Sequence, residues 1–276
     1  MTDSYAVIGN PIRHTKSPLI HTTFARQTGQ DIDYGSLEAP LGGFAAVVDR
    51  FRAGGGCGLN ITAPFKLDAF AYATELKEAA RRAGAVNAMK FEGDHVIADN
   101  FDGIGLVNDI QRNLEWPIKG RRVLLLGAGG AAHGALLPIL EQQPAEVVIV
   151  NRTVRRAEEM RDQIATRGTL LATGFAELPH AHPGPFDLVI NATSASQQDE
   201  LPPIDTGVFA ATTLAYEMVY GKGLTPFLRL AKSAGAPRLA DGVGMLVEQA
   251  AEAFLWWRGV RPHTRPLIEH LTVPLA

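Results

Sequence analysis

The segment VLLLGAGGAAHGALLPIL, residues 123–140, decides the fold of this chain. Its first residues are apolar enough for a buried strand, the glycines form a turn, and a helical segment follows. Gly127 permits the tight turn, Gly129 lets the backbone approach a pyrophosphate, and Ala132 fits where the helix meets the strand. Free N–H groups and the dipole at the start of that helix favour an anion. The segment therefore predicts a dinucleotide site formed by Gly127, Ala128, Gly129, Gly130 and Ala131.

The next predicted strand, EVVIVN (146–151), indicates which dinucleotide binds. An NAD enzyme usually carries Asp or Glu at the end of this strand, where the carboxylate binds the ribose 2′-hydroxyl. This chain continues with NRTVRRA (151–157), and without a carboxylate Arg152 can pair with a 2′-phosphate or stack on adenine. We therefore expect NADP rather than NAD, held by Asn151, Arg152, Thr153 and Arg156. The alternative is a basic helix start that simply faces water.

Composition and charge argue against several classes of protein. The formal net charge of −3 gives no basic surface for a nucleic-acid backbone. The single cysteine, Cys57, excludes an internal disulfide and a cysteine-rich metal site. We find no targeting signal and no run of about 20 apolar residues that would span a membrane. We expect a soluble, cytoplasmic monomer or homodimer that binds a small-molecule substrate and no metal, nucleic acid or membrane.

Short apolar runs alternate with longer segments of helical period, which is typical of a mostly parallel sheet covered by helices. We expect strands at 5–9, 57–62, 122–127, 146–151, 186–191 and 212–218, and helices at 17–29, 102–114 and 241–259. The predicted fold class is α/β with two domains. Residues 1–102 and 240–276 would form an N-terminal α/β substrate domain completed by C-terminal helices. Residues 103–239 would form a Rossmann-type dinucleotide-binding domain.

The segment NITAPFK, residues 60–66, raises a different question. Pro64 is predicted at the first position of a helix, where its missing N–H costs least. Lys66 would then lie in the first helical turn, where the macrodipole disfavours a cation by roughly 0.3–1 kcal/mol. Either Lys66 is a tolerated surface lysine, or it has a partner and a substrate.

Further short motifs accompany these segments: NPIRHTKSP (10–18), AGAVNA (83–88), ADNFDGIG (98–105), EMVYGKGLTPF (217–227) and DGVGMLVEQA (241–250). Together with the glycine turn, NRTVRR and NITAPFK, their order and spacing resemble the shikimate dehydrogenase family over essentially the whole chain. The resemblance implies an NADP-dependent oxidoreductase that reversibly reduces 3-dehydroshikimate to shikimate. That reaction belongs to the shikimate pathway of chorismate and aromatic amino acid biosynthesis.

The resemblance implies that Lys66 and Asp102 form the catalytic pair. A neutral lysine can accept the hydroxyl proton while hydride leaves a secondary alcohol. The helix dipole lowers the cost of the neutral amine, while Asp102 stabilises the charged form and orients it. The unfavourable position of Lys66 thereby gains a chemical purpose.

The same resemblance implies a set of ligand-binding side chains. For the substrate these are Thr15, Ser17, Asn60, Thr62, Asn87, Tyr220 and Gln249, and near the nicotinamide Met218 and Gly242. Structural alternatives exist: Ser17 and Thr62 could cap helices that open at Pro18 and Pro64, and Asn87 could be a turn residue. Gln249 could face solvent, and core packing or a tight turn would explain Met218 and Gly242.

Several positions depart from the family pattern: Thr15, Ala63, Ala88, Phe101, His133 and Glu217. Phe101 replaces the usual threonine beside Asp102, which adds apolar volume and removes a hydroxyl. It either reshapes the pocket or repacks its wall. A substrate hydroxyl left without a partner costs ~1–3 kcal/mol, so we expect shikimate turnover to fall by about one to two orders of magnitude. The alternatives are a dehydrogenase for quinate or another hydroxylated ring acid, and an NADP-binding regulatory protein without chemistry.

Overall fold

The computed structural model describes residues 2–164 and 169–275. Its chain divides into two compact units, Met1–Gly105 with Val247–Leu267 (unit 1) and Leu106–Leu246 with Ile268–Ala276 (unit 2). The expected first domain, residues 1–102 and 240–276, differs from unit 1 at residues 240–246 and 268–276, which belong to unit 2. For the end of the chain, Leu275 packs against an apolar cluster of unit 2, which explains the difference.

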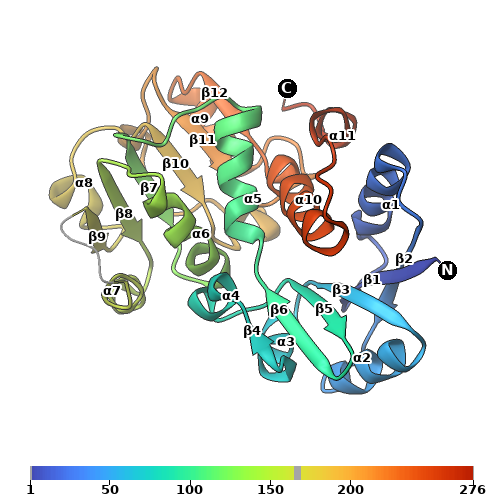
Figure 1. The fold of residues 1–276 in the computed structure, drawn as a ribbon. Helices are drawn as coiled ribbons and strands as arrows, with labels where there is room; N and C mark the ends of the chain where they lie inside the picture. Colours follow the sequence, from blue (N-terminus) through green and yellow to red (C-terminus); the bar gives the residue numbers. More distant parts are fainter. Residues whose placement is uncertain (1, 165–168, 276) are drawn as a thin grey trace. The chain divides into compact units, whose positions relative to one another are not determined.

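Unit 1 is built on a six-stranded mixed sheet of order β2-β1-β3-β5-β6-β4. The strands are β1 (Asp3–Gly9), β2 (Ile32–Glu38), β3 (Gly56–Ile61), β4 (Glu75–Leu76), β5 (Ala88–Glu92) and β6 (His95–Asp99). Strand β1 lies parallel to both β2 and β3, whereas β5 is antiparallel to β3 and β6. The first helices of the chain are α1 (Ser17–Thr28), α2 (Phe44–Ala53), α3 (Lys66–Tyr72) and α4 (Glu78–Ala83) (Figure 1).

The alternation of side chains along β1 gives this sheet two apolar faces. Ala6 and Ile8 belong to one buried cluster, which α2, α3 and α4 cover. Tyr5 and Val7 belong to the opposite cluster, which includes Trp257 of α10 (Val243–Arg258). Helix covers on both faces therefore bury residues 5–9 of β1 and hold the carboxyl ends of β1 and β3 in place.

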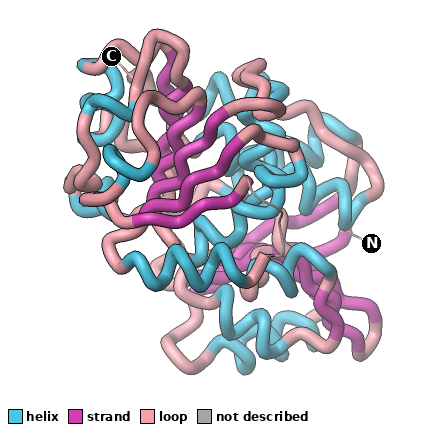
Figure 2. Tube along the Cα trace, turned by 90° about the vertical axis from the view of Figure 1, so that its left-hand side faces the viewer, coloured by secondary structure: helices cyan, strands magenta, loops and turns pink. Residues whose placement is uncertain are grey.

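Unit 2 contains a six-stranded, fully parallel sheet of order β12-β11-β10-β7-β8-β9 (Figure 2, magenta). Its strands are β7 (Arg122–Leu126), β8 (Glu146–Val150), β9 (Leu170–Thr173), β10 (Leu188–Asn191), β11 (Leu214–Glu217) and β12 (Arg238–Ala240). The chain order reverses between β7 and β10, as in a Rossmann fold, where ligands bind beyond the carboxyl ends of the strands. The α/β class and the Rossmann-type fold are confirmed.

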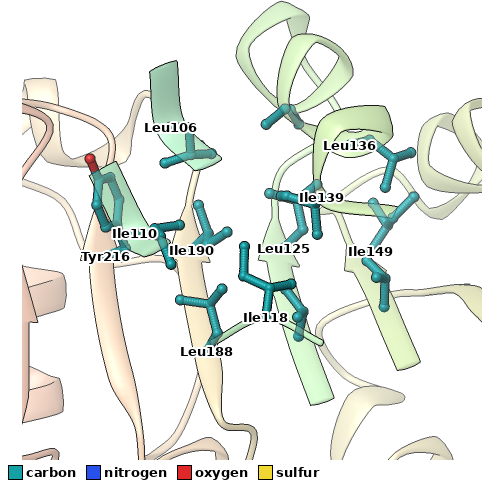
Figure 3. Close-up of a cluster of buried hydrophobic side chains, with 14 of the residues drawn as sticks. Leu106, Ile110, Ile118, Leu125, Leu136, Ile139, Ile149, Leu188, Ile190 and Tyr216 are labelled. Atoms are coloured by element: carbon teal, nitrogen blue, oxygen red, sulfur yellow. The ribbon is translucent and has the colours of Figure 1, made fainter. Parts of the chain in front are cut away.

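Helices cover both faces of this sheet. On one face, Leu125, Ile149 and Ile190 pack with Leu136 and Ile139 of α6 (Gly130–Glu141) (Figure 3). Helix α7 (Val154–Asp162) also lies on this face. The other face packs against α8 (Leu178–Ala181) and α9 (Pro226–Ser233). The remaining helical elements are α5 (Asp102–Asn108), the π turn Asp109–Asn113, the 3₁₀ turns Ala195–Gln198 and Thr206–Val208, and α11 (Arg265–Leu271).

Each of the six strands expected from the sequence has a counterpart, but the predicted start of α3 is wrong. The Thr62 carbonyl accepts the Phe65 N–H at 3.0 Å, so residues 62–65 form a turn and the helix begins at Lys66. Pro64 therefore lies inside this turn and not at the first helical position. Lys66 still lies in the first helical turn, as expected. Within the described residues, no helix is long and apolar enough to cross a membrane.

Candidate active site

Lys66 and Asp102 come together in unit 1, each at the first residue of a helix. The ammonium group of Lys66 donates a hydrogen bond to Oδ2 of Asp102. Their side chains are 35% and 19% exposed, so the pair is held by the protein yet open to a ligand. The Lys66 carbonyl accepts the Val86 N–H at 3.0 Å, which ties the start of α3 to the segment before β5.

Asn87 holds the second oxygen of the Asp102 carboxylate. Its Nδ2 donates to Asp102 Oδ1 at 2.9 Å, and its Oδ1 accepts the Phe101 N–H at 2.8 Å. The Asp102 N–H donates to Oδ1 of Asn100 at 3.0 Å. Both carboxylate oxygens therefore have protein partners, and this buried amide does more than form a turn.

Asn60 and Gln249 extend this network. Asn60 Nδ2 donates to the Asn87 carbonyl at 3.4 Å, and Asn87 Nδ2 lies 3.4 Å from Oε1 of Gln249. Gln249 is half-buried, so it does not project freely into solvent from α10. Lys66, Asp102, Asn87, Asn60 and Gln249 are thus joined by hydrogen bonds within one unit.

The two hydroxyl residues Thr15 and Ser17, at the start of α1, form a pair of their own. Thr15 Oγ1 donates to Ser17 Oγ at 3.2 Å and accepts the Ser17 N–H at 3.3 Å. The residue at the N-cap of α1 is Lys16, and that of α3 is Phe65. The alternative interpretation of Ser17 and Thr62 as helix caps is therefore wrong, which leaves their hydroxyl groups for another role.

Tyr220, Met218 and Gly242 belong to unit 2, where the loop after β11 carries the first two. Buried Glu217 anchors this loop: its carboxylate accepts from Asn191 Nδ2 at 2.9 Å and from the Val219 N–H at 3.2 Å. Burial raises the pKa of Glu217, and these hydrogen bonds oppose the rise. A Cβ at Gly242 would lie 2.2 Å from the Met218 carbonyl oxygen, so only glycine fits beside this loop. Tyr220 itself is 42% exposed.

The glycine-rich turn joins β7 to α6 at the carboxyl end of the unit 2 sheet. Gly127 has the positive φ of 107° that this turn needs, and its N–H donates to the Val150 carbonyl at 2.7 Å, which continues the pairing of β7 with β8 into the turn. A Cβ on Gly129 or Gly130 would meet no atom within 4 Å. The exposed backbone at the start of α6 is therefore accessible to an anionic group, which the free N–H groups of a helix start can bind.

The basic segment 151–156 follows β8, the strand that pairs with β7. Asn151 Nδ2 donates to the Thr153 carbonyl at 2.9 Å, which shapes the segment before α7. Arg152 and Arg156 are exposed, and neither forms an ion pair with a carboxylate in the part of the chain that the structure describes. These residues fit an NADP 2′-phosphate by charge and position. No cluster of three or more potential metal ligands occurs among residues 2–164 and 169–275.

Phe101 packs into the wall of unit 1. Its ring lies 5.6 Å from that of Trp256 in an edge-to-face arrangement, next to the cluster of Tyr5 and Trp257. Of the two outcomes expected for this substitution, the contact favours a repacked wall.

Sequence reasoning missed Tyr34, whose hydroxyl donates to Asn60 Oδ1 at 2.6 Å. Strand β2, which carries it, was not predicted, and no local motif links the two residues. The one signal in the sequence was a large aromatic residue, Tyr34, within a short and mostly polar segment, which could have suggested that its side chain is buried.

Three family models match the chain. They describe the shikimate dehydrogenase substrate binding domain (residues 7–89), shikimate / quinate 5-dehydrogenase (109–199) and the shikimate 5′-dehydrogenase C-terminal domain (242–271). The shikimate dehydrogenase (NADP(+)) of Chromobacterium violaceum is 57% identical over 276 residues, covering 100% of both chains.

Solved structures are similar over the same length. An Ael1 enzyme from Pseudomonas putida has a TM-score of 0.95 and 55% identity, with 100% of each chain covered. The shikimate 5-dehydrogenase of Thermus thermophilus, in complex with NADP(H) and shikimate, has a TM-score of 0.85 and 28% identity. That match covers 97% of this chain and 98% of the other.

Proposed function

This chain belongs to the shikimate dehydrogenase family, and from that premise we propose that it catalyses the NADP-dependent, reversible reduction of 3-dehydroshikimate to shikimate. It is an NADP-dependent oxidoreductase that acts on a secondary alcohol. The observation that carries the proposal is the Lys66–Asp102 pair, whose carboxylate is also held by Asn87. The reaction places the protein in the biosynthesis of chorismate and the aromatic amino acids.

Lys66 moves the proton in this proposal. In the oxidising direction its neutral amine accepts the proton of the substrate hydroxyl, and in the reducing direction its ammonium group donates to the carbonyl oxygen. NADP, when bound, supplies or accepts the hydride. The helix dipole at the start of α3 favours the neutral amine. Asp102 favours the ammonium form and fixes its direction, because Asn87 prevents the carboxylate from turning.

Unit 1 provides most of the proposed substrate site. The hydroxyl pair of Thr15 and Ser17 suits a carboxylate, since each hydroxyl can donate a hydrogen bond. The amides of Asn60, Asn87 and Gln249, with the hydroxyl of Thr62, suit the alcohols of a polyhydroxylated ring. For Tyr220, a role in substrate binding stays a prediction from the resemblance.

Unit 2 provides the proposed NADP site. The turn Gly127–Ala131 would bind the pyrophosphate, and Asn151, Arg152, Thr153 and Arg156 would hold the 2′-phosphate and adenine. Met218 and Gly242 would lie near the nicotinamide. A cytoplasmic location and a monomeric or homodimeric state stay predictions, which cell fractionation and light scattering would test.

Steady-state oxidation of shikimate and quinate, each with saturating NADP and then NAD, tests the proposal. We expect turnover of shikimate with NADP, reduced about a hundred- to ten-thousandfold in Lys66→Ala. The variant should keep its thermal stability, because a partly exposed ion pair contributes little. Preference for quinate would favour the second substrate that one matching family model names. NADP binding without turnover of any ring acid would indicate a regulatory protein and contradict the proposal.

The reduced turnover expected from Phe101 also stays a prediction. Phe101→Thr should raise kcat for shikimate if this residue limits activity, and should lower stability, because the contact with Trp256 is lost. An unchanged kcat with reduced stability would mean that Phe101 is only a packing substitution.

A further inference from the structure

Tyr34 occupies a buried position beside the proposed substrate site. Its side chain is 7% exposed, and its hydroxyl donates to Asn60 Oδ1 at 2.6 Å. Burial raises the pKa of Tyr34 well above its usual value, and hydrogen bonding with Ser17 opposes the rise. The phenol therefore stays protonated and donates to Asn60, which is proposed to bind substrate.

The surroundings of Asn60 determine which way its amide points. Asn60 Nδ2 faces the Asn87 carbonyl, which can only accept a hydrogen bond. Oδ1 must then face Tyr34, whose hydroxyl can donate. With Oδ1 bonded to Tyr34 and one N–H to the Asn87 carbonyl, the second amide N–H of Asn60 remains for a ligand. Asn60 is 5% exposed, so water does not replace a lost partner freely.

A stack of rings holds Tyr34 in this position. His21 on α1 lies flat against the Tyr34 ring, with centroids 4.2 Å apart and an interplanar angle of 4°. The Trp257 ring lies 5.4 Å from that of His21 and 6.5 Å from that of Tyr34. Complete burial lowers the pKa of His21 to about 3, so its ring is neutral at physiological pH. Within residues 2–164 and 169–275 neither buried ring nitrogen forms a hydrogen bond of good geometry, but Asn60 lies close enough to oppose the lowering of this pKa.

We propose that Tyr34 is a positioning residue: its hydrogen bond to Oδ1 holds the Asn60 amide in the orientation that the Asn87 carbonyl sets, so that the remaining N–H donates to a ring hydroxyl oxygen of the substrate. The inference rests on the proposed function, in that Asn60 must contact a hydroxylated ring acid. Because Tyr34 donates to Asn60, whereas Lys66 donates to Asp102, Tyr34 affects binding of the ring and not the proton transfer.

Tyr34→Phe in the full-length protein tests this role, with Tyr5→Phe as the matched control. Tyr5 is 5% exposed, stacks on Trp257 in the same cluster, and accepts from Arg258 and not from Asn60. We expect Tyr34→Phe to raise the KM for shikimate about three- to tenfold, with kcat and the KM for NADP unchanged. Tyr5→Phe should leave all three constants unchanged. An equal effect of the two variants would overturn the proposal.

A double-mutant cycle shows whether the effect passes through Asn60. Shikimate affinity is measured by calorimetry in Asn60→Ala, with and without Tyr34→Phe. We expect no further loss from Tyr34→Phe in this background. A loss as large as in the wild-type background would mean that Tyr34 acts through the general packing of unit 1, which contradicts the proposal.

A third measurement separates this inference from the proposed function. The side-chain amide resonances of Asn60, identified by their absence in Asn60→Ala, should shift in Tyr34→Phe and stay unchanged in Tyr5→Phe. Unshifted resonances would overturn the orienting role. Failure of the wild-type protein to bind or oxidise shikimate would overturn the proposed function, and with it the role of Tyr34 toward that substrate.

Discussion

Arg152 and Arg155 differ in their partners, although both belong to the basic segment after β8. Arg155 Nε donates to Glu159 Oε1 at 2.8 Å within α7. Arg152 lies before α7, next to the turn that would hold the pyrophosphate, and forms no ion pair with a described carboxylate. Position relative to β8, and not basic character alone, therefore distinguishes the residue proposed to bind the 2′-phosphate.

Arg152→Ser should raise the KM for NADP about ten- to a hundredfold, because a charge-assisted contact to the 2′-phosphate is lost. The KM for NAD, which lacks this phosphate, should be unchanged. Steady-state kinetics with both cofactors measures the difference, and Arg155→Ser is the matched control. Equal effects of the two substitutions would indicate a general influence of positive charge.

At the scale of elements, two glycines in the turn between β7 and α6 have different roles, one in folding and the other in binding. Gly127 requires its positive φ of 107°, and a Cβ there would lie 3.2 Å from the Ala192 carbonyl oxygen. Gly129 has φ −97°, which any residue can adopt, and a Cβ there would meet open space. Glycine at the first position serves the turn, while glycine at the second leaves room for a ligand.

Gly129→Ala should therefore raise the KM for NADP at least about tenfold while the melting temperature stays unchanged, since the new methyl group would obstruct the pyrophosphate. Gly127→Ala should instead destabilise the protein by about 1–3 kcal/mol through backbone strain. Calorimetric melting and cofactor titration of both variants measure these effects. A loss of stability in Gly129→Ala would contradict the assignment of this glycine to the ligand.

At the scale of the whole molecule, burial of His21 links folding to pH. The unfolded chain takes up a proton on this imidazole near pH 6.5, whereas the folded chain does so only near pH 3. Between these values the unfolded state binds more protons, so the free energy of unfolding falls as pH is lowered. By pH 5 the loss from this one residue is roughly 2 kcal/mol.

His21→Phe should remove this contribution, because a phenyl ring can stack on Tyr34 and does not titrate. Urea unfolding gives the free energy of unfolding at pH 7.5 and at pH 5. Its fall between the two pH values should be smaller in the variant than in wild type by roughly 2 kcal/mol. The control is His95→Gln, an exposed position on β6, which should behave as wild type. The same pH dependence in His21→Phe and wild type would show that His21 is not the group responsible.

The sequence by itself determined the dinucleotide turn, the principal strands and the candidate catalytic pair. The signals for the turn lie within eighteen consecutive residues, where glycine positions, apolar strand and helix can be recognised together. Strand β2 lacks such a signal, because its side chains are mostly polar or half-exposed, and it is recognised only through its pairing with β1.

Only the tertiary structure decided which polar groups meet. Tyr34 pairs with Tyr5 on one side of β1, Asn60 pairs with Val7 on the other, and sheet register brings the two side chains into contact. Asn87 and Gln249 meet across 162 positions of sequence. Hydrogen bonds depend on distances of a few ångströms and on donor direction. Local sequence sets neither of these for residues on different elements, because packing of the sheet and its helices positions them.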